Sequence, residues 1–314
     1  MKNVAVMGLG YISKRVAEGV ALSQNANLYA FASRDINKAK EMAEKMQVSY
    51  YYGSYEEMLA NPDIDVVYIC TPNREHVKHI KMCMDKGKHV ICEKPLTSSI
   101  EEVKVIYAYA RNKNCFLLEA EKTIFTPLNT KIKNMVEEGI IGKLRMIDAS
   151  YCANISFASY DKNLWNFDEK YGGSSYDVGV YPLCFANFYA NSKIVSHTIQ
   201  RSNAHELNVD FDAAMLLQYE NGMIATLRSS WDLPCTNRGI LFGEDGYIEI
   251  ENFWKNREAY LIKNGNRIKI EVEMKSDFCG EIEHAIDCIE KGLQESPILG
   301  EKESIEIIKV LERS

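Results

Sequence analysis

Three short stretches of the sequence carry residue types that could do chemistry, and the first lies near its start. Gly8 and Gly10 follow an apolar run, and Ile12, Val16 and Val20 then recur at helical spacing. In such a strand-to-helix turn the glycines permit a tight turn and a close approach to a pyrophosphate, while the N–H groups of the helix start face the phosphates. The segment therefore predicts a dinucleotide site that is contacted by Gly8, Gly10, Tyr11 and Ile12.

The second stretch is Glu93-Lys94-Pro95, which follows an expected strand at 89–92. A lysine at the carboxyl end of a sheet strand can hold a substrate hydroxyl, and beside an oxidised nicotinamide its cation can lower the pKa of that hydroxyl. Taken alone, the tripeptide is more often a solvated strand end. We predict that Lys94 is catalytic and that Glu93 and Lys94 contact the cofactor.

The third stretch contains Asp177 and Tyr181, which are four residues apart in an expected helix at 176–189 and would share one face of it. A tyrosine near a lysine cation has a lowered pKa and can give or accept a proton, and the carboxylate can orient it or the substrate. The alternative is that Asp177 only complements the helix dipole and that Tyr181 only packs. We predict that both are catalytic and bind the substrate.

Two more strand ends predict cofactor contacts. Ser33 and Arg34 follow an expected strand at 27–33 and could bind the 2′-phosphate of NADP, whereas Asp35 could accept hydrogen bonds from the ribose hydroxyls of NAD. We favour a helix-capping role for Asp35, so NADP(H) is the preferred cofactor and NAD(H) the alternative. An expected strand at 65–70 is followed by Thr71, Pro72 and Asn73 and, one helical turn later, by His76. We predict that these residues contact the cofactor; the alternative is that they form a turn that caps the next helix.

The order of the expected elements predicts two domains. Strands alternate with helices as far as residue 120, which is typical of an α/β, doubly wound parallel sheet in a first domain, 1–120. The second domain, 121–314, is expected to be α+β with a mostly antiparallel sheet, because strand-like runs follow one another and are separated by glycine turns. A helix at about 301–314 could pack back on the first domain.

Composition and charge narrow the class of protein. The 314 residues are 46% hydrophobic and 26% charged, which is ordinary for a globular protein, and the net charge of -7 argues against nucleic acid or an anionic membrane as partner. No apolar run approaches the ~20 residues of a membrane span. The nine cysteines form no Cys-x-x-Cys pair, which favours a reduced, cytoplasmic location.

No metal site is expected. His76, His79 and Cys83 would fall on one face of a helix, but the sequence offers no fourth ligand at a recognisable spacing. We expect these three residues to lie on a solvated helix face.

Together these stretches resemble the Gfo/Idh/MocA oxidoreductases. The resemblance runs from the Gly8–Ser13 segment through Cys70-Thr-Pro-Asn73 and Glu93-Lys-Pro95 to Gly172-Gly173 and Asp177-Val-Gly-Val-Tyr181. It implies that Lys94 is catalytic and contacts the cofactor, and that the acidic residue and the tyrosine four later are Asp177 and Tyr181. The tyrosine variant is similar to the glucose-fructose oxidoreductase and dihydrodiol dehydrogenase branch, in which NADP is the usual cofactor.

The sequence departs from those relatives in the stretches that should line the substrate. They usually carry an aromatic residue near position 122 and an arginine near 124, where this chain has Lys122 and Ile124. It also has Asn166 where an arginine is common. We predict that Lys122 and Trp165 contact the substrate. For Trp165 an equal alternative is that it is simply a buried aromatic residue.

The resulting hypothesis is an NAD(P)-dependent oxidoreductase that transfers hydride between the nicotinamide and a secondary alcohol or carbonyl of a sugar, cyclic polyol or dihydrodiol. The alternatives are a non-catalytic NAD(P)-binding regulator and an NAD-dependent glycosidase-type hydrolase. Apolar residues alternate along 211–219 and 223–231, so a homodimer or homotetramer through the second-domain sheet is expected.

Overall fold

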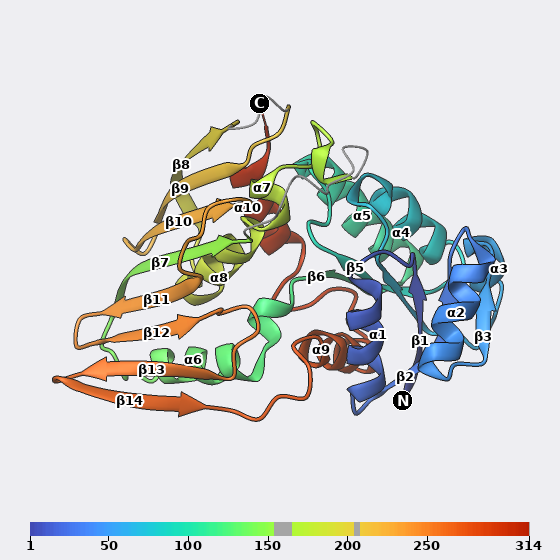
Figure 1. The fold of residues 1–314 in the computed structure, drawn as a ribbon, viewed down its shortest axis with the longest axis horizontal. Coiled ribbons are helices and arrows are strands. Elements are labelled where there is room, and N and C mark those ends of the chain that lie inside the picture. The colour runs from blue at the N-terminus through green and yellow to red at the C-terminus, as the bar shows by residue number, and fades with distance from the viewer. Residues whose placement is uncertain (154–164, 204–207, 314) are drawn as a thin grey trace. The chain divides into compact units, whose positions relative to one another are not determined.

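The N-terminal strands form a six-stranded sheet in the order β3-β2-β1-β4-β5-β6 (Figure 1). Every pairing is parallel, and the order reverses between β1 and β4, which is where open α/β sheets bind their ligands. The prediction of a doubly wound parallel sheet is therefore confirmed. The strands are β1 Lys2–Met7, β2 Ala26–Ala32, β3 Tyr50–Tyr52, β4 Val66–Ile69, β5 His89–Glu93 and β6 Leu117–Ala120.

Helices connect these strands and cover the sheet. The buried positions of α1 and α4 follow helical spacing, and β4 is buried along its whole length, as a strand covered on both faces must be. The helices are α1 Ser13–Leu22, α2 Ile36–Met46, α3 Tyr55–Leu59, the short 3-10 helix η1 Asn73–Glu75, α4 His76–Met84 and α5 Ile100–Lys113.

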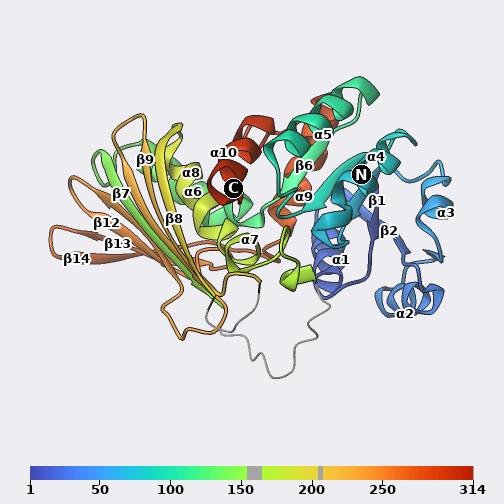
Figure 2. The same ribbon diagram turned by 90° about the horizontal axis from the view of Figure 1, so that it is seen from above.

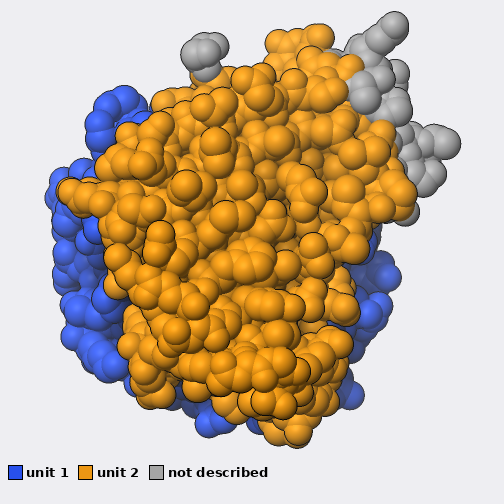
Figure 3. Space-filling model, turned by 90° about the vertical axis from the view of Figure 1, so that its left-hand side faces the viewer, with its two compact units in different colours: residues 1–120, 275–305 blue, residues 121–274, 306–314 orange. Residues whose placement is uncertain are grey.

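The computed structural model describes residues 1–153, 165–203 and 208–313, and these form two compact units, coloured separately in Figure 3. Unit 1 contains 1–120 and 275–305, and unit 2 contains 121–274 and 306–314. Unit 1 therefore includes a late segment that the expected division at residue 120 assigned to the second domain.

Close packing explains why this late segment belongs to unit 1. It carries α9, Cys279–Glu290, and a Cβ placed on Gly19 of α1 would lie 2.5 Å from the Cβ of Phe278. Arg15 donates two hydrogen bonds from Nη2 to the carboxylate of Asp277, at 2.8 and 2.7 Å. A glycine and an ion pair with a nearly buried carboxylate thus bring α1 and the start of α9 together.

Unit 2 is built on an eight-stranded sheet in the order β14-β13-β12-β11-β7-β10-β9-β8, and the β7–β10 pair is its parallel one. The prediction of a mostly antiparallel sheet is confirmed. The strands are β7 Leu144–Cys152, β8 Ile194–Ser202, β9 Asp212–Tyr219, β10 Ile224–Ser230, β11 Arg238–Gly243, β12 Tyr247–Glu251, β13 Glu258–Lys263 and β14 Asn266–Glu271.

One face of this sheet is covered by helix α8, Val180–Ala190 (Figure 2). A Cβ on Gly239 of β11 would lie 2.6 Å from the ring of Phe185, and the hydroxyl of Tyr219 donates to Asn187 Oδ1 at 2.7 Å. Burial alternates along β9 as a half-covered sheet requires.

Two local expectations differ from the structure. The helix predicted at 176–189 is interrupted: α7 covers Ser174–Asp177 and α8 starts at Val180. Between them, the N–H of Gly179 donates to Ser174 O, five residues back, so the regular ladder is broken there. The structure also contains α6, Pro127–Glu137, which we did not predict although Thr126 caps it and proline occupies its first turn.

Candidate functional site

The glycine turn after β1 is shaped by close backbone packing. Gly8 has φ of +88°, and a Cβ there would lie 2.7 Å from Thr71 Cγ2 and 3.0 Å from Thr71 N. A Cβ on Gly10 would meet only Cys70 O, at 3.8 Å, so the backbone of this turn is open to a ligand. The residues present therefore fit the pyrophosphate of a dinucleotide. Tyr11, on the same turn, is 98% exposed.

The segment after β2 carries the residues on which the two cofactor alternatives depend. Asp35 Oδ1 accepts a hydrogen bond from the N–H of Asn37 at 3.0 Å and so caps α2, the role that we favoured. Ser33 is buried, and its Oγ accepts from the N–H of Asp35 at 3.1 Å. Arg34 is exposed. The carboxylate of Asp35 is thus engaged by the protein, while the guanidinium of Arg34 faces solvent.

The segment after β4 is tied to the segment after β5 by His76. Its Nε2 lies 2.9 Å from Thr71 O and its Nδ1 lies 3.1 Å from Leu96 O, and the side chain is only 1% exposed. Burial lowers its pKa to about 4, so the ring is neutral near pH 7 and donates to one of the two carbonyls. The structure thus places a backbone carbonyl oxygen next to each ring nitrogen of His76, for which the sequence predicts a cofactor contact.

The expected solvated face of this helix is wrong. His79 and Cys83 are buried like His76, and His79 Nδ1 lies 2.9 Å from Thr71 Oγ1. Asn73, which starts η1, is buried as well. In the described ranges, no group of three or more His, Cys, Asp or Glu side chains is placed to hold a metal ion.

Lys94 stands at the carboxyl end of β5 in a segment that is fixed on both sides. Before it, Glu93 Oε1 lies 3.1 Å from the hydroxyl of the buried Tyr68, which lies 2.7 Å from Glu281 Oε1 as well. After it, the N–H of Leu96 donates to Glu119 Oε1 at 3.0 Å. The Lys94–Pro95 peptide bond is cis. These contacts connect the residues on either side of Lys94 to two buried side chains.

Glu119 is itself fully buried on β6. Its other oxygen accepts a hydrogen bond from Ser304 Oγ at 2.5 Å. Burial raises the pKa of its carboxyl, and the hydrogen bonds from Ser304 and Leu96 and the charge of Lys94 oppose that rise. A buried acid that contacts a backbone N–H here serves to shape the Lys94 segment.

In unit 2, Asp177 is held by two side chains that come from other elements. Asp177 Oδ2 accepts from Trp231 Nε1 at 3.0 Å and from Asn166 Nδ2 at 3.3 Å. Trp231 is buried in a cluster with Val178, Val209 and Phe211. Trp231 fixes the carboxylate, and sequence reasoning missed this because the two residues are far apart in the chain.

Tyr181 lies among aromatic side chains at the start of α8. The ring of Tyr151 meets it edge-on, with centroids 5.2 Å apart, and stacks on Trp254 at 3.8 Å. The prediction that Asp177 and Tyr181 lie on one continuous helix is wrong, because α7 ends at Asp177 and α8 starts at Val180. Both remain half-buried residues of unit 2.

The two predicted substrate contacts lie in short 3-10 helices of unit 2. Lys122 starts η2, Lys122–Phe125, and is buried, although lysine is rarely so. Trp165 starts η4, Trp165–Phe167, and is half-buried. Phe167, two residues later, meets Trp231 edge-on at 5.8 Å. The segment of Trp165 therefore contacts the residue that holds Asp177.

Comparison with known proteins decides the family. The model described as "Oxidoreductase family, NAD-binding Rossmann fold" matches residues 2–120, and that described as "GFO/IDH/MocA C-terminal domain" matches 129–249. The chain belongs to the GFO/IDH/MocA oxidoreductase family. Members of this family carry the NAD-binding fold that the first unit shows, so the predicted resemblance is confirmed.

Named relatives of this family cover nearly the whole chain. Trans-1,2-dihydrobenzene-1,2-diol dehydrogenase of Mus musculus is 30% identical over 301 residues, which is 93% of this chain and 89% of that protein. The enzyme of the same name from Xenopus laevis is 30% identical over 296 residues, covering 91% and 88%. The prediction of an NAD(P)-dependent oxidoreductase acting on CH–OH groups is confirmed, and these relatives lend no support to the regulator or the glycosidase.

Solved structures share the fold. Aldose-aldose oxidoreductase from Caulobacter crescentus, complexed with glycerol, has a TM-score of 0.89 at 23% identity, covering 98% of this chain and 94% of that one. KijD10, a 3-ketoreductase from Actinomadura kijaniata in complex with NADP, has a TM-score of 0.81 at 22% identity, covering 99% and 95%. Within the described part of this family member, no helix has the length and apolar character that a membrane crossing needs.

Proposed function

We propose that this chain is an NADP(H)-preferring dehydrogenase whose substrate is a secondary alcohol or carbonyl compound of the sugar, cyclic polyol or dihydrodiol class. The observation that carries the proposal is the fixing of Lys94: Glu93 before it and Leu96 after it are both held by buried side chains. A solvated strand end needs no such support. The similarity to trans-dihydrodiol dehydrogenases supports the substrate class.

Each candidate residue then has a role. A bound NADP would supply the acceptor or donor of hydride. Lys94 would hold the substrate oxygen and stabilise negative charge on it, and Tyr181 would accept the hydroxyl proton in oxidation or return it in reduction. Asp177 would orient the substrate or Tyr181, with Lys122 and Trp165 as further substrate contacts.

The cofactor preference rests on the segment after β2. Because Asp35 caps α2, Ser33 and Arg34 are the groups that would meet the 2′-phosphate of NADP. The other cofactor contacts that we propose lie on the glycine turn, Gly8, Gly10, Tyr11 and Ile12, after β4, Thr71, Pro72 and Asn73, and after β5, Glu93 and Lys94.

The experiment is a parallel titration of the protein with NADPH and NADH, followed by quenching of Trp fluorescence, and a rate assay with NADP+ and trans-1,2-dihydrobenzene-1,2-diol or aldoses. We expect NADPH to bind at least about 10-fold more tightly, and Arg34→Ala to remove that difference because one charge-assisted contact is lost. Arg145→Ala, which alters an exposed ion pair with Glu244, is the control. Equal affinities for NADPH and NADH would contradict the proposed preference for NADP. If neither nucleotide binds, the proposed dehydrogenase function is contradicted.

We also propose a homodimer or homotetramer through the open face of the unit 2 sheet. Met146, Leu216 and Ile224 lie on that face and are 37%, 54% and 42% exposed, although they are large apolar residues. Sedimentation should show an oligomer at micromolar concentration, and Leu216→Arg should shift it to monomer. A wild-type monomer would contradict this assembly. A cytoplasmic location remains our proposal, supported by nine cysteines without a disulfide.

A further inference from the structure

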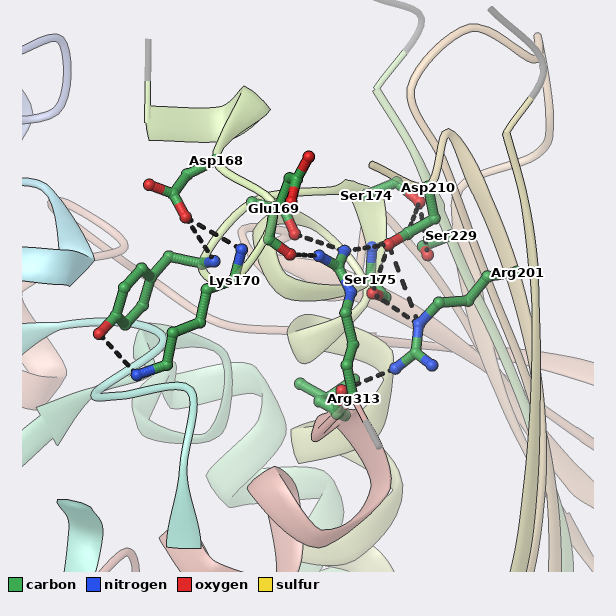
Figure 4. A network of polar contacts seen from close by, with 12 residues as sticks. Asp168, Glu169, Lys170, Ser174, Ser175, Arg201, Asp210, Ser229 and Arg313 are labelled. Atoms are coloured by element: carbon green, nitrogen blue, oxygen red, sulfur yellow. Dashed lines mark hydrogen bonds and ion pairs between the residues drawn. The ribbon is translucent and has the colours of Figure 1, made fainter. Parts of the chain in front are cut away.

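A buried aspartate that the reaction does not use caps α7 from a distant part of the chain. Asp210 lies just before β9 with its side chain 1% exposed. Its Oδ2 accepts from the N–H of Ser175 at 2.7 Å and from Ser174 Oγ at 3.0 Å, and its Oδ1 accepts from Ser175 Oγ at 3.1 Å (Figure 4). The residue at the capping position of α7 is Gly173, which has no side chain of its own to do this.

Arg313 pairs with this aspartate from the C-terminal end of the described chain. Its Nη2 donates to Asp210 Oδ1 at 2.6 Å and to Gly172 O at 2.8 Å, and its Nη1 donates to Glu169 O. In Figure 4 the guanidinium reaches up from the end of α10, Glu301–Leu311, to the turn that precedes α7. One planar group thus joins two carbonyls of the segment before α7 to Asp210, which lies just before β9.

Arg201 of β8 holds the C-terminal residues in place. Its Nη2 donates to Leu311 O at 2.6 Å, and its Nε lies 3.4 Å from Ser175 Oγ. Its Nε is 3.9 Å from Asp210 Oδ1, too far for a direct hydrogen bond. Arg313 is therefore the cation that directly compensates the buried carboxylate.

There is no spare space in this contact. A Cβ placed on Gly173 would lie 2.4 Å from Asp210 Oδ1 and 2.5 Å from Arg313 Nη2, and its φ is +96°. The absence of a side chain at 173 lets both charged groups reach the backbone of the turn.

The same turn carries Asp177. The N–H of Asp177 donates to Gly173 O at 3.0 Å, so one turn of helix joins the capped end to the candidate catalytic carboxylate. Removal of Arg313 would leave the charge of Asp210 buried without its closest cation, which is strongly unfavourable. Rearrangement of Asp210 would move the start of α7.

We propose that Arg313 and Asp210 form a positioning clamp that holds α7 so that Asp177 and Tyr181 meet the substrate in the reactive geometry. This inference rests on the proposed function and adds the last part of the chain to it. Arg313 touches neither substrate nor cofactor in this role and acts through the helix.

The test compares Arg313→Ala, Arg313→Lys and the control Arg145→Ala in the full chain, using NADP+ and the substrate found by the rate assay. We expect kcat of Arg313→Ala to fall about 10- to 100-fold, since small misplacements of reacting groups have effects of that size. The Kd of NADPH should stay within about twofold, because unit 1 holds it and remains folded. Millimolar guanidinium should restore part of the lost kcat, and Arg313→Lys should fall between the two.

The outcomes separate this inference from the proposed function. Local hydrogen exchange at 173–181 should rise in Arg313→Ala and stay unchanged in Arg145→Ala, without any substrate being needed. If Tyr181→Phe abolishes turnover while Arg313→Ala keeps wild-type kcat, the clamp is overturned and the function stands. If Tyr181→Phe also keeps wild-type kcat, the proposed function fails first. A fall in kcat that guanidinium does not reverse, with unchanged exchange at 173–181, also overturns the clamp.

Discussion

The proposed cofactor residues of unit 1 (the cofactor half) and the proposed substrate residues of unit 2 (the substrate half) are each held in place by a different kind of contact. In unit 1, Gly8, Arg34 and Lys94 directly follow parallel strands, so the sheet itself brings them to one edge. In unit 2, Asp177 depends on Trp231, and its helix depends on Asp210 and Arg313. In the first half, position at the strand ends selects the residues, although Tyr68 and Glu119 also support the Lys94 segment. In the second half, contacts with residues far along the chain do so.

The largest effect should come from the remote contact to Asp177. Asp177→Asn removes the charge and should lower kcat about 100-fold. Trp231→Phe removes the N–H donor and should lower kcat about 10-fold, because the carboxylate then loses its 3.0 Å hydrogen bond. Steady-state kinetics with a saturating cofactor measure both. Asp245→Asn, in the turn after β11, is the matched control. Unchanged kcat in Trp231→Phe would show that the substrate half does not need its remote support.

A pair of glycine variants compares a crowded turn with an open one in the same unit. Gly173 and Gly222 both have positive φ, +96° and +85°, but a Cβ meets Asp210 at 2.4 Å in the first and nothing within 4 Å in the second. Gly173→Ala should destabilise the fold by about 3 kcal/mol or more, and Gly222→Ala by about 1–2 kcal/mol from backbone strain alone. Urea unfolding measures the difference. Equal losses of unfolding free energy in the two variants would mean that Asp210 and Arg313 move aside easily, and would contradict a rigid clamp.

The pH dependence of stability tests the support of the cofactor half. Burial lowers the pKa of His76 to about 4, against 6.5 for an ordinary histidine. Between pH 6.5 and pH 4, the unfolded chain therefore binds a proton that the folded chain does not bind. The contribution of neutral His76 to the free energy of unfolding is present above about pH 6.5. It is lost as the pH falls toward 4, by about 3 kcal/mol at most.

Denaturant unfolding of wild type and His76→Gln across this range measures that loss. The stability difference between the two should shrink as the pH falls, and the control His197→Gln, at a half-exposed histidine of β8, should follow wild type. A constant difference from pH 7 to pH 4.5 would contradict the lowered pKa of the buried His76.

The smallest effect concerns Asp35. If its carboxylate only caps α2, Asp35→Ala should lower the free energy of unfolding by about 1 kcal/mol and leave the NADPH affinity within about twofold. Thermal unfolding and the nucleotide titration measure the two quantities. A marked loss of NADH affinity would instead assign Asp35 to the ribose.

Much of the fold could be predicted from the sequence because its signals are local. The alternation of strands and helices predicts unit 1, and successive strand-like runs separated by glycine turns predict the unit 2 sheet. The order of the unit 2 strands was not predictable: β7 lies between β11 and β10, pairing parallel with the latter, and no local pattern encodes which strand is its neighbour.

The candidate site divides in the same way. Asp35 as a helix cap followed from its place at a strand end, whereas the break after Asp177 did not, because Val178 and Gly179 do not interrupt the apolar pattern. The helix face that carries His76 and His79 was expected to be solvated but is buried. The sequence does not distinguish the two, because histidine is found in both settings. Asp210 and Arg313 carry no motif at all, and only the folded chain brings them to α7.

The most direct test of the hydride-transfer function is the turnover of Lys94→Ala and Tyr181→Phe against wild type, with NADP+ and a dihydrodiol or sugar substrate, together with the Kd of NADPH for each. We predict that each variant lowers kcat by about 100-fold or more, and that Tyr181→Phe binds NADPH as wild type does. Wild-type kcat in both variants would contradict the assignment of proton transfer to this pair.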